Sequence, residues 1–475
     1  MANMKGLFRD TAIYGLSSIV GRFLNYLLVP LYTHYMPQSS GDYGVSTNMY
    51  AYTALIFVVL TFGMETTLFR YAQDGHEQPD TVFSTAFSVV GCLTALFLLA
   101  VFGCIGPISE ALGYAAHPEY LLMMAAVVAL DALQALPFCL LRYQRRAIRF
   151  ASLKLLFIAL NIGLNVFCFV VLGKTSVFYV FFINLLCTGF ITFFFLPDLF
   201  RIHWRFDGRL LRRMLSYSWP ILLLGIVGIL NQVADKILFP EVYPDKAGAW
   251  RELGVYGSCV KIAMIMAMIT QAFRYAYEPI VFAKAKDADG NEYYAAAMKY
   301  FLIFTLLAFL CVVGYMPLLQ YIIGAEYRAG LKVVPIVMVA EIMMGVYFNL
   351  SFWYKLIDRT IYGAVFSLAG CIVLFAVNLW GIPRYGYMAC AWGGVAGYGT
   401  AMLLSYLVGQ RLNPIPYPIR AMAGYTAVAA LFYYLMTLAA AGWTMWQQLA
   451  LATVLILAFA AIICRRELGA WRTHG

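Results

Sequence analysis

The sequence predicts an all-α integral membrane protein, and three observations support this fold class. Of its 475 residues, 63% are hydrophobic and only 12% are charged, whereas soluble domains carry about 25% charged residues. Apolar runs of about 18 to 26 residues recur to the end of the chain, and each is long enough to cross a bilayer as a helix. The polar connections between them are shorter than about 20 residues, too short for a separate folded domain. We therefore expect the helices themselves to carry the function.

The apolar runs predict about fourteen transmembrane helices. An even number places both ends of the chain on the same side of the membrane. In chain order the expected spans are 11–36, 43–66, 81–106, 119–141, 152–173, 175–197, 215–240, 253–276, 296–323, 331–354, 360–381, 385–409, 419–440 and 445–464.

Basic residues are concentrated in alternate connections, which predicts the orientation of the helices. Lys and Arg are enriched in the cytoplasmic loops of inner-membrane proteins. The basic set begins after the fourth span, with Arg142, Arg145, Arg146, Arg149 and Lys154. The intervening connections hold only Lys174, Lys246, Arg251, Arg328 and Arg384. Both termini are therefore expected in the cytoplasm and the protein in the bacterial inner membrane. The formal net charge of +10 reflects this asymmetry, and no nucleic-acid partner is expected.

Short sequence echoes suggest that the chain contains two similar halves. Residues 69–72 and 273–276 both read Phe-Arg-Tyr-Ala, and the mid-span acids Asp131 and Glu341 fall in the fourth and tenth spans. Offsets of about 205 to 210 residues pair each span with the sixth span after it, which runs in the same direction. The expected organisation is a six-helix bundle at 1–205, a second at 206–410, and an additional helix pair at 411–475.

Arg22 lies near the middle of the first expected span, where a charge is costly. Placing a guanidinium at the bilayer centre costs about 2.5–3.5 kcal/mol on insertion scales. Ser18 and Asn25 fall on the same helical face as Arg22, and Val29 is the apolar interruption of that face. A polar face of this kind is typical of a helix that lines a cavity rather than one that faces lipid.

Three further cations, Lys236, Lys261 and Arg274, lie within or near the edges of the seventh and eighth spans. At membrane depth each needs a counter-charge or an anionic substrate. One interpretation pairs the cations structurally with acids, for which the candidates are Glu65, Asp131, Asp235, Glu278 and Glu341. The other is a cationic cavity, lined also by Arg22, that binds an anion. For Arg274, a place at the cytoplasmic interface is a further alternative.

Asp131 and Glu341 lie near the middle of their spans, where carboxylates are rare. In secondary transporters such groups bind the coupling proton or sodium ion, and in a static bundle they pair with a cation such as Arg22. The sequence leaves both interpretations open.

The sequence shows no motif for catalysis or metal binding. Its ten cysteines contain no CxxC pair, and its five histidines are isolated. Residues 173–176 read Gly-Lys-Thr-Ser, as at the end of a P-loop, but Cys168 stands where the first glycine is required. We therefore expect no catalytic residue, no metal and no cofactor.

Three stretches carry a resemblance to a known family. The first runs from Gly15 through Val29-Pro30-Leu31-Tyr32-Thr33 and Asp42-Tyr43-Gly44 to Gly63 and Phe69-Arg70-Tyr71. The second runs from Gly254-Val255-Tyr256-Gly257 to Pro279, and the third comprises Asn378 and Ile382-Pro383-Arg384-Tyr385-Gly386. With the span count and orientation, they resemble the polysaccharide transporters, or Wzx-type flippases, of the multidrug/oligosaccharidyl-lipid/polysaccharide (MOP) superfamily. Residues 387–392 depart from the family's usual Gly-Ala-Ala form, which leaves the subfamily open.

The resemblance implies two six-helix bundles in a V-shaped arrangement around a central cavity, with a C-terminal helix pair. It implies a polyprenyl-pyrophosphate-linked oligosaccharide as substrate, moved to the outer leaflet by alternating access. Related lipid flippases carry cations on the first and eighth helices that are assigned to the pyrophosphate. Arg22, Lys261 and Arg274 occupy the matching helices here.

We therefore expect a flippase for the repeat unit of O-antigen, capsule or exopolysaccharide, coupled to protons or sodium ions. It would act among membrane lipids, and contact with other polysaccharide-assembly proteins is compatible with this role. The alternatives are a lipid II flippase and a drug/cation antiporter of the same fold, although Arg22 and Lys261 favour an anionic cargo. A polytopic glycan polymerase or ligase is disfavoured, because such an enzyme would be expected to carry a sizeable extracytoplasmic loop.

Overall fold

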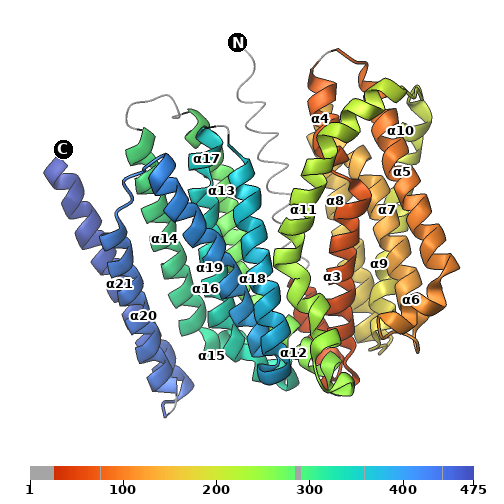
Figure 1. Ribbon diagram of the computed structural model, residues 1–475. Helices are drawn as coiled ribbons and strands as arrows, with labels where there is room; N and C mark the ends of the chain where they lie inside the picture. The colour runs from red at the N-terminus through yellow and green to blue at the C-terminus, as the bar shows by residue number, and fades with distance from the viewer. Residues whose placement is uncertain (1–25, 75, 284–289, 358, 441, 475) are drawn as a thin grey trace. The chain divides into compact units, whose positions relative to one another are not determined.

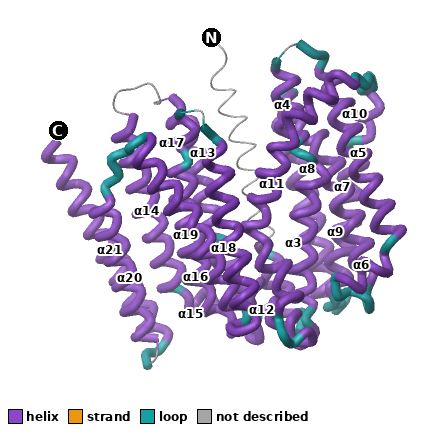
Figure 2. The backbone as a smooth tube through the Cα atoms, in the orientation of Figure 1, coloured by secondary structure: helices purple, strands orange, loops and turns teal. Residues whose placement is uncertain are grey.

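The computed structural model describes residues 26–74, 76–283, 290–357, 359–440 and 442–474. Every regular element in these ranges is a helix, as the tube in Figure 2 shows, which confirms the all-α fold class. Helices are expected in a chain of this composition because lipid offers no water to hydrogen-bond an open backbone.

Eleven of the described helices are long and apolar enough to cross a membrane, or twelve if the bent pair Lys246–Ala263 and Ile265–Arg274 forms one span. The expectation of about fourteen spans is therefore not matched within the described residues. The first expected span, 11–36, lies largely outside them. A further helix, α19 (Tyr387–Leu412), is 26 residues long, but it is rich in glycine and is not among the eleven.

The chain divides into two compact units. The N-terminal unit comprises Met1–Glu241 and Asp245–Gly254, and the C-terminal unit comprises Val242–Pro244 and Val255–Gly475. Residues 206–241 thus pack with the N-terminal helices, although the repeat-based division assigns them to the second half. The division at 205 and 410 stays a prediction about the repeat, because compactness does not test sequence repetition.

The N-terminal unit is a bundle of helices (Figure 1), and two of its spans, Asp42–Gln73 and Val177–Arg201, are each made of two consecutive helices. Its elements are α2 (Leu28–Tyr35), η1 (Gln38–Ser40), α3 (Asp42–Thr61), α4 (Met64–Gln73), α5 (Pro79–Gly103), α6 (Ile105–Ala111), α7 (Pro118–Tyr143), α8 (Ala147–Val166), the π-helical turn η2 (Phe167–Val171), α9 (Val177–Phe193), α10 (Leu196–Arg201) and α11 (Gly208–Val242). α12 (Lys246–Ala263) begins in this unit and ends in the other.

The central helix of the N-terminal unit is α7, which packs against α3, α4, α5, α8 and α9. Its apolar core includes Met64 of α4, Phe83 of α5, Leu136 of α7 and Met214 of α11, each at most 1% exposed. Asp131 lies on this helix, between its two ends and among helices of the same unit.

The C-terminal unit is a second bundle. Its elements are α13 (Ile265–Ala283), α14 (Gly290–Gly314), α15 (Met316–Leu319), η3 (Gln320–Ile322), η4 (Ala325–Val333), α16 (Val334–Leu350), α17 (Phe352–Leu356), α18 (Ile361–Tyr385), α19, α20 (Ile419–Ala440) and α21 (Met445–His474). α18 and α19 approach closely, since a Cβ on Gly370 would lie 2.6 Å from the carbonyl oxygen of Gly397. Small residues permit such contacts between membrane helices.

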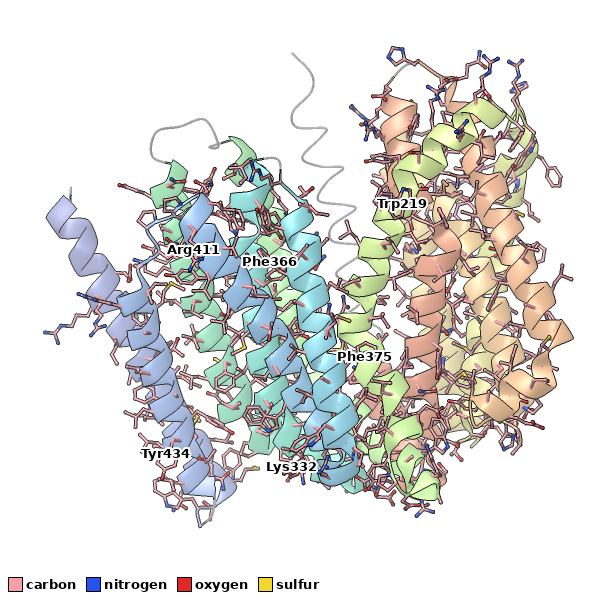
Figure 3. The ribbon with its side chains drawn as sticks, viewed as in Figure 1. Trp219, Lys332, Phe366, Phe375, Arg411 and Tyr434 are labelled. Carbon is pink, nitrogen blue, oxygen red and sulfur yellow. The ribbon has the colours of Figure 1, made fainter. Side chains whose placement is uncertain are left out.

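The helix pair α20 and α21 lies at the edge of the C-terminal unit, where it packs on α14 (Figure 1). The apolar windows of both helices are only 11% buried, and side chains such as that of Tyr434 on α20 point away from the bundle (Figure 3). This exposure is what a helix pair facing lipid requires.

Candidate functional site

The structure describes five of the eight predicted site residues. Arg22 and its polar neighbours Ser18 and Asn25 lie outside the described residues. The predicted cavity face of the first helix therefore stays a prediction, and the site is built from the remaining charges.

Lys236 on α11 is part of a local ion pair. Its Nζ lies 2.9 Å and 3.0 Å from the two carboxylate oxygens of Asp235 and donates to the carbonyl oxygen of Gln232 at 3.0 Å. The side chains of Lys236 and Asp235 are only 19% and 10% exposed. The neighbouring acid thus compensates the charge of Lys236, and the structural interpretation accounts for this pair.

The backbone at Lys236 is held by a buried polar chain. Asn48 of α3 donates from Nδ2 to the carbonyl oxygen of Lys236 at 2.8 Å, and its Oδ1 accepts from the Tyr114 hydroxyl at 2.7 Å. Burial raises the pKa of the Tyr114 phenol well above its ordinary value, which keeps this hydroxyl protonated as a donor. The Tyr114 ring also packs on Trp250 of α12, with centroids 5.1 Å apart. These contacts fix the end of α11 within its unit.

In the C-terminal unit, Arg274 and Glu341 lie on helices that pack together, α13 and α16. The Arg274 guanidinium lies over the Phe348 ring, with Cζ 5.1 Å from the centroid. A Cβ on Gly345 would meet Thr270, one turn before Arg274, at 3.0 Å. Glu341, Gly345 and Phe348 therefore form the strip of α16 that faces α13. Lys261 is half-buried near the end of α12.

In the N-terminal unit, Asp131 belongs to a cluster of four charges. Arg142, near the end of the same helix, pairs with Glu65 of α4 at 3.3 Å. Lys154 of α8 lies close enough to Asp131, Glu65 and Arg142 for their charges to interact. Its Nζ is 4.0 Å from the Phe138 ring centroid. Two acids and two bases from α4, α7 and α8 thus interact through Lys154 and through the Glu65–Arg142 pair.

Sequence reasoning misplaced Lys154. Lys154 is grouped above with the basic connection before the fifth span, although the expected span 152–173 already includes it. α8 begins at Ala147, so Lys154 lies two turns inside the helix. The buried positions Ala147, Phe150 and Leu153 already follow a helical spacing through the basic segment. That spacing is the signal that could have placed Lys154 inside the helix.

The cluster can hold or release a proton, since it combines two carboxylates with an amine. It offers no metal site: within the described part of the chain, no three His, Cys, Asp or Glu side chains group closely enough to hold an ion.

Comparison with known proteins relates the chain to one sequence family and one fold. A family profile described as polysaccharide biosynthesis protein matches residues 39–331, more than half of the chain. The comparison with curated proteins finds no match. Among solved structures, the lipid II flippase MurJ in an inward closed conformation is similar, with a TM-score of 0.75 at 14% identity; the match covers 95% of this chain and 99% of that chain.

Two transporters extend the likeness in fold. An inward-facing multidrug resistance MATE family transporter of the MOP superfamily matches with a TM-score of 0.65 at 14% identity, over 82% of this chain and 94% of that one. A MOP superfamily transporter from Pyrococcus furiosus matches with a TM-score of 0.56 at 15% identity, over 85% and 95%. The chain thus has the MOP fold. Because the profile covers more than half of the sequence, this multi-pass membrane protein belongs to the family of polysaccharide biosynthesis proteins.

Proposed function

We propose that the protein is a flippase that moves polyprenyl-pyrophosphate-linked oligosaccharide from the cytoplasmic to the outer leaflet of the bacterial inner membrane. The observation that carries the proposal is the combination of a polysaccharide biosynthesis family with the fold of a lipid II flippase along 95% of the chain. A protein with both properties is suited to a lipid-linked glycan. The repeat unit of O-antigen, capsule or exopolysaccharide is the substrate class, and alternating access is the mode of transport.

In this proposal Arg22, Lys261 and Arg274 bind the pyrophosphate. A cation at membrane depth is costly unless it meets an anion or a counter-charge, and the pyrophosphate supplies the negative charge during transport. Lys236 is the weakest of the four proposed contacts, because Asp235 already compensates its charge. Asp131 and Glu341 are the proposed coupling acids for protons or sodium ions. Both termini are cytoplasmic in this arrangement.

A drug/cation antiporter is the second candidate, since MATE transporters share the fold. Its cargo is a cation, whereas Lys261 and Arg274 favour an anion. A lipid II flippase differs only in the glycan and is separated by the same experiment. An enzyme such as a glycan polymerase is disfavoured: among the described residues, no connection between spans is long enough to form a catalytic domain.

Deletion of the gene, followed by analysis of lipid-linked glycans, tests the proposal. Accumulation of an oligosaccharide-linked polyprenyl pyrophosphate on the cytoplasmic leaflet is expected, and accumulation of lipid II would indicate the other flippase. Increased drug sensitivity with no accumulated glycan would refute the proposal.

Complementation with single variants then tests the cations. Loss of one charge-assisted phosphate contact costs about 1.5–3 kcal/mol, so Lys261→Gln and Arg274→Gln should each weaken binding about 10- to 150-fold. Arg384→Gln is the matched control, because Arg384 is an exposed arginine that donates to its own helix at the Trp380 carbonyl oxygen. Unimpaired export by both test variants, at normal expression, would remove these residues from the site.

A further inference from the structure

Three positions on one face of α7 organise the charge cluster of the N-terminal unit. Asp131, Phe138 and Arg142 are seven and eleven residues apart, spacings that place side chains above one another on a helix. At a rise of about 1.5 Å per residue, Phe138 lies about 10 Å and Arg142 about 16 Å along the axis from Asp131. The acid and the arginine are thus at opposite ends of a short stripe with an aromatic ring between them.

Lys154 reaches this stripe from α8 and rests on its middle member. Its Nζ lies 4.0 Å from the Phe138 ring centroid, a cation–π contact. Among the described residues, no carboxylate lies within ion-pair distance of this ammonium, whereas Glu65 is engaged by Arg142 at 3.3 Å. A lysine stem is flexible, so the ammonium can move from the ring toward either acid.

The ionisable groups around Asp131 are few. Tyr50 of α3 interacts electrostatically with it and accepts a hydrogen bond from Asn184 of α9 at 3.0 Å. The other ionisable groups near this stripe are Glu65 of α4, Cys139 and Arg142 of α7, Lys154 of α8 and Cys187 of α9, while α5 contributes only Cys92 and the distant Asp80. With tyrosine and cysteine neutral, the four charges sum to zero.

We propose that Lys154 is an exchangeable counter-ion shared by Asp131 and Glu65, and that proton binding at Asp131 transfers Lys154 from the first acid to the second. When Asp131 is ionised, it attracts the ammonium toward its own end of the stripe. A proton taken from water onto an Asp131 carboxyl oxygen changes the cluster from net zero to +1. Glu65 is then the remaining anion for both Lys154 and Arg142.

This competition connects protonation to helix packing. The Glu65–Arg142 pair joins α4 to α7, and a second cation at Glu65 weakens the hold of Arg142 on it. Proton binding at the centre of α7 therefore loosens a contact about 16 Å away along the axis. The inference rests on the proposed function in one respect: the role assigned to this movement is the coupling of transport to protons.

Infrared difference spectroscopy on the purified full-length protein tests the exchange without any substrate. The carbonyl stretch of a protonated carboxylic acid is followed as a function of pH, and Asp131→Asn identifies the Asp131 contribution. Removal of a neighbouring cation favours the neutral acid, so Lys154→Met should raise the midpoint of the Asp131 band by one pH unit or more. Glu65→Gln removes the competing acid, so Lys154 stabilises ionised Asp131 alone and the midpoint of the Asp131 band should fall. Lys154→Arg should stay near the wild type.

A double variant separates exchange from simple charge effects. If Glu65 acts through Lys154, Glu65→Gln should shift the midpoint much less in the Lys154→Met background. Lys332→Met is the matched control, since Lys332 also rests on a ring, with Nζ 5.3 Å from the Tyr387 centroid in the other unit (Figure 3). It should leave the band unchanged.

Three results would overturn the proposal: an Asp131→Asn spectrum with the same titrating band, an unmoved midpoint in Lys154→Met, or equal Glu65→Gln shifts in both backgrounds. Should Lys154→Met fail to fold, the contrast between an unchanged midpoint in Lys154→Arg and a lowered midpoint in Glu65→Gln carries the test, and equal midpoints in these two variants would overturn the proposal. The spectra do not involve glycan, so a negative result here leaves the flippase assay unaffected, and the reverse also holds.

Discussion

Glu467 is expected to fasten the C-terminal helix pair to the rest of its unit. Its carboxylate, on α21, accepts hydrogen bonds from Lys299 Nζ of α14 at 2.5 Å, from the Tyr300 hydroxyl at 3.2 Å, and from the Tyr425 hydroxyl of α20 at 2.8 Å. Three helices therefore meet at one carboxylate. Because α20 and α21 are otherwise little buried, this contact should contribute a large share of their local stability.

Replacement of Glu467 by Gln keeps the size of the side chain and removes its charge. Breaking a buried ion pair costs about 3–5 kcal/mol, and exposed pairs contribute much less. The side chains of Lys299 and Glu467 are 18% and 15% exposed, which places this pair toward the buried limit. Allowing for the remaining contact with solvent, we expect a loss of about 2–3 kcal/mol. This corresponds to an increase of about 30- to 150-fold in the population of locally opened helix pair.

Hydrogen exchange of the detergent-purified protein measures this opening, because protection of amides reports local free energies. Protection of α20 and α21 should fall by that factor in Glu467→Gln. The double variant Lys299→Met/Glu467→Gln should recover part of it, since removing both charges leaves no unpaired ion. Thr453→Val, which removes a neutral contact with the Tyr315 hydroxyl at 2.9 Å, is the control. Unchanged protection in Glu467→Gln, or strictly additive losses in the double variant, would refute the reasoning.

Two further predictions concern glycines at helix contacts. Gly44→Ala should abolish recovery of monodisperse protein in size-exclusion chromatography, because the new Cβ would lie 1.8 Å from the backbone oxygen of Trp250. Gly91→Ala is the control and should behave as wild type, since it has open space around it. Normal recovery of Gly44→Ala would contradict the packing of α3 on α12. Gly393→Ala should lower the free energy of unfolding by about 1–3 kcal/mol, because its Cβ would lie 2.9 Å from Asn378 Oδ1. Adding Asn378→Ala should recover part of that loss. A double variant no more stable than Gly393→Ala would show that the clash lies elsewhere.

The helices could be predicted from the sequence because apolar length decides where a chain crosses lipid. The expected span 119–141 became α7, Pro118–Tyr143, and 360–381 became α18, Ile361–Tyr385. Helix ends were less predictable. α8 extends five residues before its expected start at 152, because backbone hydrogen bonding continues through polar residues that the apolar count leaves out.

The site was predictable only in its parts. A mid-span acid such as Asp131 is visible as a rare residue in an apolar run, and the Lys236–Asp235 pair joins sequence neighbours. The electrostatic partner of Asp131 was not predictable, because Lys154 comes from another helix. Periodicity within one helix shows which residues lie on the same face of that helix. Tertiary packing decides which other helix covers that face.

The two units hold their mid-span acids in the same local setting. Seven residues after Asp131 is Phe138, with Lys154 over its ring, and seven residues after Glu341 is Phe348, with Arg274 over its ring.

The repeat itself stays a prediction, since the two cations come from helices at different places in the two halves. The correspondence has a physical use. A cation placed on a ring two turns from an acid feels the field of that acid and retains a stabilising contact of about 0.5–2 kcal/mol when the acid is neutral. Such a cation can move away from its acid and keep a stabilising contact, which the proposed coupling of transport to an ion would require.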